Sequence, residues 1–127
     1  MKFLITGGTG LIGARLTDVL IANGHSVNIL SRKFKTSVNS SLNYFSWNPA
    51  KNIVDKESIK DVDVIINLAG SSVFSLWTNS AKKQIIKSRI DSLSTIYNLL
   101  NNSKHKVKRI ISASAIGIYP NHKSKLH

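Results

Sequence analysis

The stretch that decides the fold is KFLITGGTGLIG, which runs from Lys2 to Gly13. Residues 2–6 are mainly apolar and end at glycines, which is typical of a buried parallel strand. From Leu11 the hydrophobic period changes to that of a helix, which the pair Asn23-Gly24 should end, because glycine suits the left-handed position after a last turn. Four apolar side chains form the predicted buried stripe of this helix: Ile12, Leu16, Val19 and Leu20.

Three glycines between the strand and the helix each have a physical task. Gly7 allows a sharp turn off the strand, Gly10 allows the backbone to approach a pyrophosphate, and Gly13 allows close packing of the helix. The start of the helix then offers free N–H groups and the positive end of its dipole to phosphates. A strand before the glycines and an amphipathic helix after them predict a dinucleotide-binding loop.

The rest of the chain repeats the alternation of strand and helix. Further strands are expected at residues 27–30, 42–47, 62–68 and 107–114, with a helical turn near 57–60 and a long helix over about 79–100. Nearly continuous apolar strands that alternate with helices predict the α/β class, a doubly wound parallel sheet with the strand order third, second, first, fourth, fifth. The predicted buried stripe of the long helix consists of Ile86, Ile90, Leu93, Tyr97 and Leu100.

Length and composition suit one globular domain, because 127 residues with 42% hydrophobic content can bury a core without staples. Cysteine is absent, which excludes disulfides and thiolate chemistry. The longest apolar runs are far shorter than a membrane span, and the glycines follow too soon for a signal peptide. We therefore expect a cytoplasmic protein. The four histidines show no paired metal spacing, so no metal site is expected.

The net charge of +12, from 18 basic and 6 acidic residues, raises the alternative of a nucleic-acid-binding protein. The lysines are scattered along the chain, and the densest basic cluster, residues 104–109, has no interleaved aromatic side chains for base stacking. We interpret the charge as mainly compositional and expect nucleic acid not to be the partner.

The segment after the second strand indicates which dinucleotide is bound. An NAD site places an acidic residue there to bind the ribose hydroxyls. Residues 31–35 instead contain three bases and no acid. The guanidinium of Arg32 could hold a 2′-phosphate with two hydrogen bonds and stack on adenine, with Lys33 beside it. This pattern favours NADP(H) over NAD(H).

Four stretches together carry a family resemblance: the glycine motif at 6–13, Asn67-Leu68-Ala69-Gly70, Trp77-Thr78 with residues 88–92, and residues 112–119. The chain resembles the extended and atypical short-chain dehydrogenase/reductases, and within them a nucleoside-diphosphate-sugar epimerase-like branch. The resemblance implies a Rossmann domain, NADP(H) binding and oxidoreductase or epimerase chemistry on an undefined small molecule. Typical members are about twice as long, so residues 1–127 look like an amino-terminal part without the substrate-binding region, and the sheet should be incomplete on its carboxyl-terminal side.

The motifs and the resemblance assign residues to roles. Ser114 matches the family's catalytic serine after the fifth strand, and Arg89 stands where many relatives carry an active-site asparagine. The spacing of Tyr119 and Lys123 imitates the family's catalytic pair, but they follow too closely and Pro120 disfavours the required helix. We expect this chain alone to be inactive; the alternative is a non-catalytic dinucleotide-binding module. The predicted cofactor-binding residues are Gly7, Thr9, Gly10, Leu11, Ile12, Gly13, Arg32, Lys33, Leu68, Ala69 and Gly70.

Overall fold

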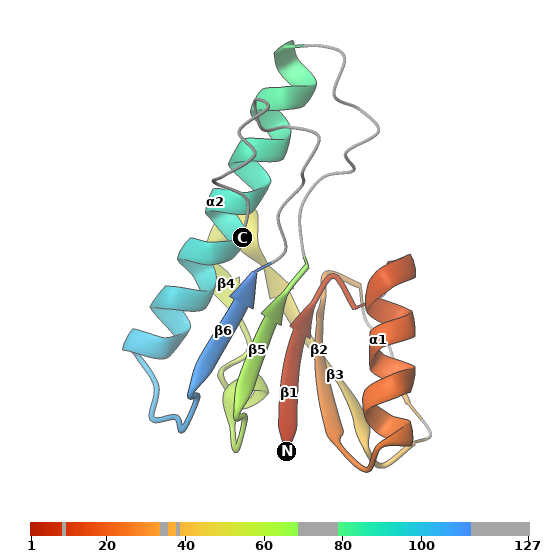
Figure 1. Cartoon of the computed structure of the whole chain (residues 1–127). Coiled ribbons are helices and arrows are strands. Elements are labelled where there is room, and N and C mark those ends of the chain that lie inside the picture. The colour runs from red at the N-terminus through yellow and green to blue at the C-terminus, as the bar shows by residue number, and fades with distance from the viewer. Residues whose placement is uncertain (9, 34–35, 38, 69–78, 113–127) are drawn as a thin grey trace, which may run out of the picture.

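The computed structural model describes residues 1–8, 10–33, 36–37, 39–68 and 79–112. In this part of the chain, one sheet has the order β4-β3-β2-β1-β5-β6, and every neighbouring pair is parallel except β3 and β4. The expected strand order is confirmed; the sequence did not predict β4, a short antiparallel addition at the edge (Figure 1). The strands are β1 (Lys2–Thr6), β2 (Ser26–Ser31), β3 (Leu42–Asn48), β4 (Ile53–Val54), β5 (Val64–Asn67) and β6 (Arg109–Ser112).

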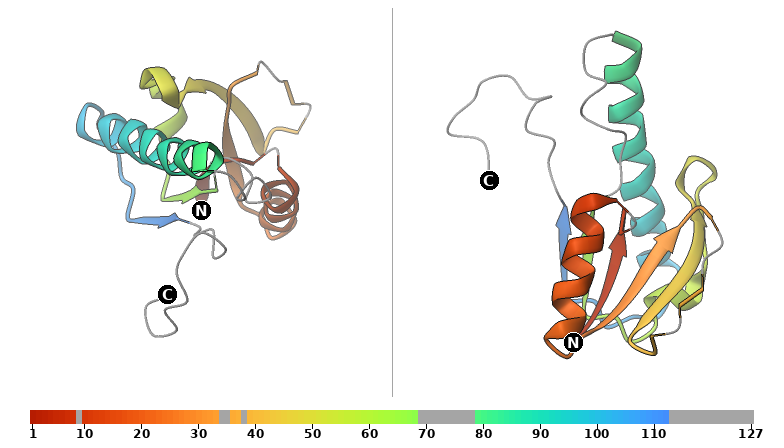
Figure 2. Two further views of the ribbon diagram at one scale, coloured as in Figure 1. Left: turned by 90° about the horizontal axis from the view of Figure 1, so that it is seen from above. Right: turned by 90° about the vertical axis from the view of Figure 1, so that its right-hand side faces the viewer.

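Helices α1 (Leu11–Ala22) and α2 (Asn79–Asn101) lie on opposite faces of the sheet (Figures 1 and 2). Alternate side chains of each strand enter the two cores, as the pleat requires. On β1, Leu4 joins the cluster that Ile96 and Leu99 of α2 complete, whereas Ile5 joins the cluster against Leu16 and Leu20 of α1. Two 3-10 turns, η1 (Pro49–Lys51) and η2 (Lys56–Ile59), follow β3 and β4.

The predicted buried stripe of α1 is only partly correct. Leu16 and Leu20 pack against the sheet, but Ile12 and Val19 are 74% and 50% exposed. The buried face instead passes through Gly13 and Thr17, whose hydroxyl donates to the Gly13 carbonyl oxygen at 2.7 Å. The helix therefore approaches the sheet along its smallest side chains, and this rotates the large apolar residues outward.

The predicted stripe of α2 is correct only in part: Leu93 is half-buried and Leu100 packs against the core. Ile86, Ile90 and Tyr97 are each more than half exposed. The face on the sheet carries two hydroxyl residues and two aliphatic residues, namely Ser92, Thr95, Ile96 and Leu99. A buried hydroxyl costs little when it finds an acceptor, and the Thr95 hydroxyl donates to the Asp91 carbonyl oxygen at 2.8 Å. A hydropathy pattern cannot predict such burial, because it treats serine and threonine as polar surface residues.

The end of α1 follows the sequence prediction. Gly24 has φ +84°, in the left-handed region, and its N–H donates to the Ile21 carbonyl oxygen at 3.0 Å. The next N–H, of His25, donates to the Leu20 carbonyl oxygen at 3.0 Å. These two bonds form the glycine cap that closes many helices.

The carboxylate of Asp63 ties the amino end of β1 to the start of β5. Its Oδ2 accepts from the Lys2 N–H at 2.9 Å, and its Oδ1 lies 3.5 Å from the Lys106 ammonium. The Lys2 N–H, and then the Lys106 charge, hold the pKa of Asp63 below its ordinary value. This anchor lies at the amino ends of the strands and therefore stabilises the end of the sheet opposite the glycine motif.

Candidate functional site

The chain leaves β1 through a tight turn built by the glycine motif. Gly7 has φ +72°, a conformation that side chains rarely adopt, and its carbonyl oxygen accepts from the Gly10 N–H at 3.1 Å. Gly10 then forms the N-cap of α1 in extended backbone geometry, without a side-chain cap. No acidic residue occupies the first turn of α1, so the positive end of the helix dipole is not neutralised within the helix.

The glycines differ in why they must lack a side chain. A Cβ on Gly13 would lie 2.3 Å from the Gly7 carbonyl oxygen, and one on Gly8 would lie 3.0 Å from three atoms of Ile29. Packing thus requires a glycine at position 13, while a side chain at position 8 would be tight against Ile29; sequence reasoning gave Gly8 no task. A Cβ on Gly10 would meet only the Gly7 oxygen, at an ordinary 3.4 Å, and the φ of −76° suits any residue. Packing within the described residues therefore does not demand a glycine at position 10.

Polar groups join the carboxyl ends of three strands. The Thr6 hydroxyl donates to Asn67 Oδ1 at 2.5 Å and accepts from the Leu68 N–H at 3.1 Å. The Asn67 Nδ2 reaches the Ser112 hydroxyl of β6 at 3.5 Å. Because Thr6 and Asn67 are almost completely buried, these bonds fix Leu68 where it leaves β5, close to the glycine turn.

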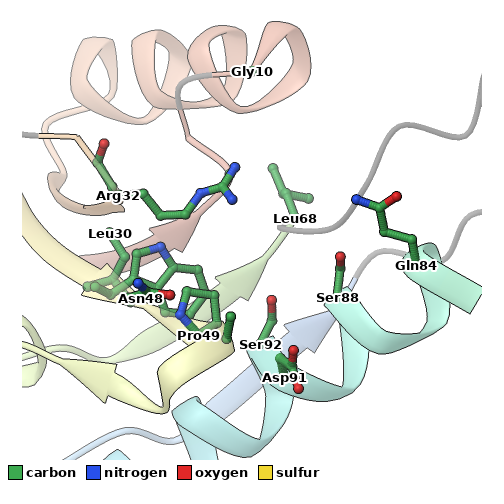
Figure 3. A pocket seen from close by; sticks show the side chains of 14 residues that line it. Gly10, Leu30, Arg32, Asn48, Pro49, Leu68, Gln84, Ser88, Asp91 and Ser92 are labelled. Atoms are coloured by element: carbon green, nitrogen blue, oxygen red, sulfur yellow. The ribbon is translucent and has the colours of Figure 1, made fainter.

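A cavity of about 460 Å³ opens between the glycine turn, the ends of β2 and β3, and α2 (Figure 3). Its size lies within the range of small-molecule sites, which are also typically concave and lined by a few polar groups. Three groups of residues line it: from the glycine turn and strand ends, Gly7, Gly10, Leu30, Ser31, Arg32 and Leu68; from the β3–η1 segment, Trp47, Asn48, Pro49 and Ala50; and from α2, Gln84, Ser88, Asp91 and Ser92.

Among the described residues that line this cavity, Arg32 is the one basic residue. Figure 3 shows its guanidinium extending from the end of β2 into the space bounded by Leu68 and α2. Ser31, the last residue of β2, directly precedes Arg32 and is buried. Its hydroxyl accepts from the Lys33 N–H at 3.2 Å. The Lys33 side chain is exposed and does not line the cavity.

Sequence reasoning missed the two walls opposite the glycine turn. The α2 wall had a signal: Gln84, Ser88, Asp91 and Ser92 follow the helical spacing i, i+4, i+7, i+8 and form a polar stripe. The β3–η1 wall had none, because its position depends on distant contacts. The Thr95 hydroxyl, which donates to the Asp91 carbonyl oxygen, lies 3.4 Å from the Pro49 carbonyl oxygen, and Asn98 Nδ2 donates to Asn52 Oδ1 at 3.0 Å.

Several predicted site residues lie elsewhere. Arg89 is half-buried on α2 and does not line the cavity, and Leu11 and Ile12 are exposed at the start of α1. Outside the described residues lie Thr9, Ala69, Gly70, Trp77, Ser114, Tyr119 and Lys123. Within the described ranges, no three histidine or acidic side chains gather as a metal site, and neither helix is long and apolar enough to cross a membrane.

Residues 3–126 match the family model described as the NAD dependent epimerase/dehydratase family. The chain belongs to this family. It is 40% identical over 119 residues to the epimerase family protein YfhF of Bacillus subtilis, a match that covers 94% of this chain and 39% of the relative. A protein of Staphylococcus saprophyticus with the same description is 38% identical over 117 residues, covering 92% of this chain and 38% of that protein. The chain thus spans about two fifths of the length of these relatives.

Solved structures agree with this family membership. The crystal structure of human epimerase family protein SDR39U1 with NADPH superposes with a TM-score of 0.70 at 25% identity, covering 94% of this chain and 38% of that one. The UDP-N-acetylglucosamine 4-epimerase of Bacillus cereus shares the fold, with a TM-score of 0.68 at 19% identity over 98% of this chain and 39% of that one. The Rossmann-type architecture is confirmed, and the sheet corresponds to only part of that in these neighbours.

Proposed function

We propose that this chain binds NADPH as the nucleotide-binding part of an epimerase-like oxidoreductase. The observation that carries the proposal is the cavity in which the glycine turn, the start of α1 and Arg32 meet. The human relative that superposes over most of the chain was solved with NADPH, which supports the same class of cofactor here. The proposed contacts are those expected from the sequence: Gly7, Thr9, Gly10, Leu11, Ile12, Gly13, Arg32, Lys33, Leu68, Ala69 and Gly70.

The pyrophosphate would lie against the glycine turn and the start of α1. At the start of any helix the first N–H groups lack partners within the helix, and here they belong to residues that follow Gly10. The open space at the Gly10 Cβ position allows oxygen atoms to approach the backbone. Backbone donors and the helix dipole would thus hold two negative charges without a lysine in the turn.

The ribose 2′-phosphate would pair with Arg32. A guanidinium offers two parallel N–H donors to a phosphate, and the part of β2 that lines the cavity contributes no carboxylate to repel it. Lys33, which is exposed and follows Arg32 in the chain, would add a second positive charge near this phosphate. We infer that NADPH binds more tightly than NADH.

Catalysis would involve residues at the carboxyl ends of the strands, as cofactor binding does. The nicotinamide supplies hydride transfer when the cofactor is bound. Ser114 follows β6, whose carboxyl end adjoins that of β5, and reactive groups gather at this edge in open parallel sheets. We propose that the Ser114 hydroxyl donates a hydrogen bond to a substrate oxygen and that Arg89 faces the substrate. Substrate binding belongs to the longer protein that the relatives represent.

Calorimetric titration with NADPH and NADH tests the cofactor preference. Arg32→Asp removes a phosphate partner and adds a repelling carboxylate. The loss of a charge-assisted hydrogen bond, about 1.5–3 kcal/mol, corresponds to roughly 10- to 150-fold weaker NADPH binding. The affinity for NADH should stay the same or rise. Arg109→Asp is the matched control, because Arg109 is exposed at the amino end of β6. Equal losses for both dinucleotides in Arg32→Asp would refute the assignment.

A further inference from the structure

The end of the cavity between the last residue of β3, Asn48, and Asp91 of α2 offers hydrogen-bond acceptors. Asn48 ends β3, and its side chain does not cap η1. Within the described residues this side chain forms no hydrogen bond. Across from it, Asp91 on α2 has a side chain that is 24% exposed. Its Oδ2 accepts from the Lys87 ammonium at 2.7 Å, and no bond to a described residue engages Oδ1. Both side chains line the cavity (Figure 3).

A carboxylate in this wall restricts which part of the ligand can lie there. The chain has only six acidic residues against 18 basic ones, and one of the six lines the proposed site of a polyanion. Asp91 would repel phosphates, so it must face an uncharged part of the ligand that carries hydrogen-bond donors. Arg32, from the end of β2, thus marks a side of the cavity that suits phosphate, and Asp91, from α2, marks a side that offers a hydrogen-bond acceptor (Figure 3).

Apolar side chains at the same end favour a base over a sugar. Leu30, Trp47 and Pro49 line the cavity beside Asn48, and Leu30 and Trp47 also belong to the buried core. Leu30 and Trp47 are 2% and 6% exposed, so the apolar face open to a ligand is mainly that of Pro49, with these two core side chains fixed behind it. Such a face suits a flat ring, whereas a ribose presents hydroxyls on several sides. The combination of this surface with unengaged acceptors suits an aromatic base whose edge carries an amino group.

We infer that Asp91 accepts a hydrogen bond from the exocyclic amino group of the adenine base, and that the Asn48 amide pairs with the adjoining base edge. This inference rests on the proposed function, because it takes the bound dinucleotide as its ligand. Asp91 thereby determines specificity for the base, as Arg32 does for the 2′-phosphate. A base with a carbonyl oxygen in place of the amino group would set its lone pairs against the carboxylate and leave both partners unsatisfied.

The test compares NADPH with deamino-NADPH, in which hypoxanthine replaces adenine, by equilibrium titration of the unmodified chain. We expect deamino-NADPH to bind at least about tenfold more weakly, because sites built around a hydrogen bond reject analogues that lack it. Asp91→Asn should bring the ratio of the two affinities close to one, since an amide can donate to the hypoxanthine oxygen. Asp18→Asn is the matched control: it makes the same charge change on the exposed face of α1 and should keep the wild-type ratio.

Each result decides the inference. Equal affinity of the unmodified chain for the two dinucleotides overturns it without any variant. If Asp91→Asn weakens both ligands equally and keeps their ratio, Asp91 contacts the ribose or acts only on the fold, and the inference is wrong. If NADPH itself does not bind, the proposed function fails, and that outcome is distinct from tight NADPH binding without discrimination between the bases.

Discussion

Two substitutions in the glycine motif should separate the requirements of packing from those of ligand binding. In Gly13→Ala the added Cβ would lie 2.3 Å from the Gly7 oxygen and 2.6 Å from the Gly8 Cα. Both are backbone atoms that cannot rotate away, so α1 must shift. Overpacking of this kind costs about 2–3 kcal/mol, which lowers Tm by roughly 6–15 °C in a domain of this size.

Gly10→Ser should behave in the opposite way. Its Cβ would make only the ordinary 3.4 Å contact, and serine is a better N-cap than glycine by a few tenths of a kcal/mol. The apo chain should therefore keep or slightly raise its Tm. The serine oxygen would occupy the N–H groups that we assign to the pyrophosphate, and NADPH affinity should fall by about tenfold or more, the equivalent of one charge-assisted hydrogen bond.

The assays are thermal unfolding by circular dichroism and titration with NADPH, performed on both variants and the unmodified chain. We expect a crossed result: Gly13→Ala loses stability, while Gly10→Ser loses affinity but not stability. Wild-type NADPH affinity in folded Gly10→Ser would refute it, because the phosphate cradle would then lie elsewhere.

Three further outcomes are expected. The pKa of Asp63 is lowered first by the Lys2 N–H and then by Lys106, so its carboxylate stabilises the fold fully above the ordinary pKa of 3.8, and this contribution is lost as the pH falls through the folded pKa. Asp63→Asn should therefore flatten the decline in Tm on acidification, and an unchanged decline would contradict this. Thr6→Val removes the buried hydroxyl that bonds to Asn67 and Leu68 and should lower the unfolding free energy by about 1–3 kcal/mol, which urea denaturation measures; an unchanged midpoint would show that these bonds contribute nothing. The 127-residue chain should show no hydride transfer with NADPH and a panel of carbonyl compounds, and turnover that Tyr119→Phe abolishes would instead make Tyr119 catalytic.

The sequence predicted the parts of the fold that depend on local physics. The strands are short apolar runs bounded by turns, and the helix cap at Gly24 needs only one residue with positive φ. The helix faces were harder, because burial on the sheet selects for close approach as well as hydropathy. Gly13 and Thr17 form the contact face of α1, and Ser92 and Thr95 form part of that of α2.

The candidate site could be predicted only on the side that the glycine motif builds. Arg32 follows β2 directly, so its position follows from the strand order. Asn48 and Asp91 are 43 positions apart in the sequence, and they line one cavity because α2 lies against η1, where Asn98 Nδ2 donates to Asn52 Oδ1. No short segment contains that information.

The central claim is that a dinucleotide lies against the glycine turn, and backbone amide chemical shifts during an NADPH titration test it most directly. We expect the largest shifts at the carboxyl ends of the strands and the start of α1, namely at Gly7, Gly8, Gly10–Gly13, Arg32 and Leu68. The basic segment at residues 104–109 lies at the amino ends of the strands, away from the glycine turn. It serves as an internal control and should not respond. Shifts confined to that loop, or none at saturating NADPH, would contradict the account.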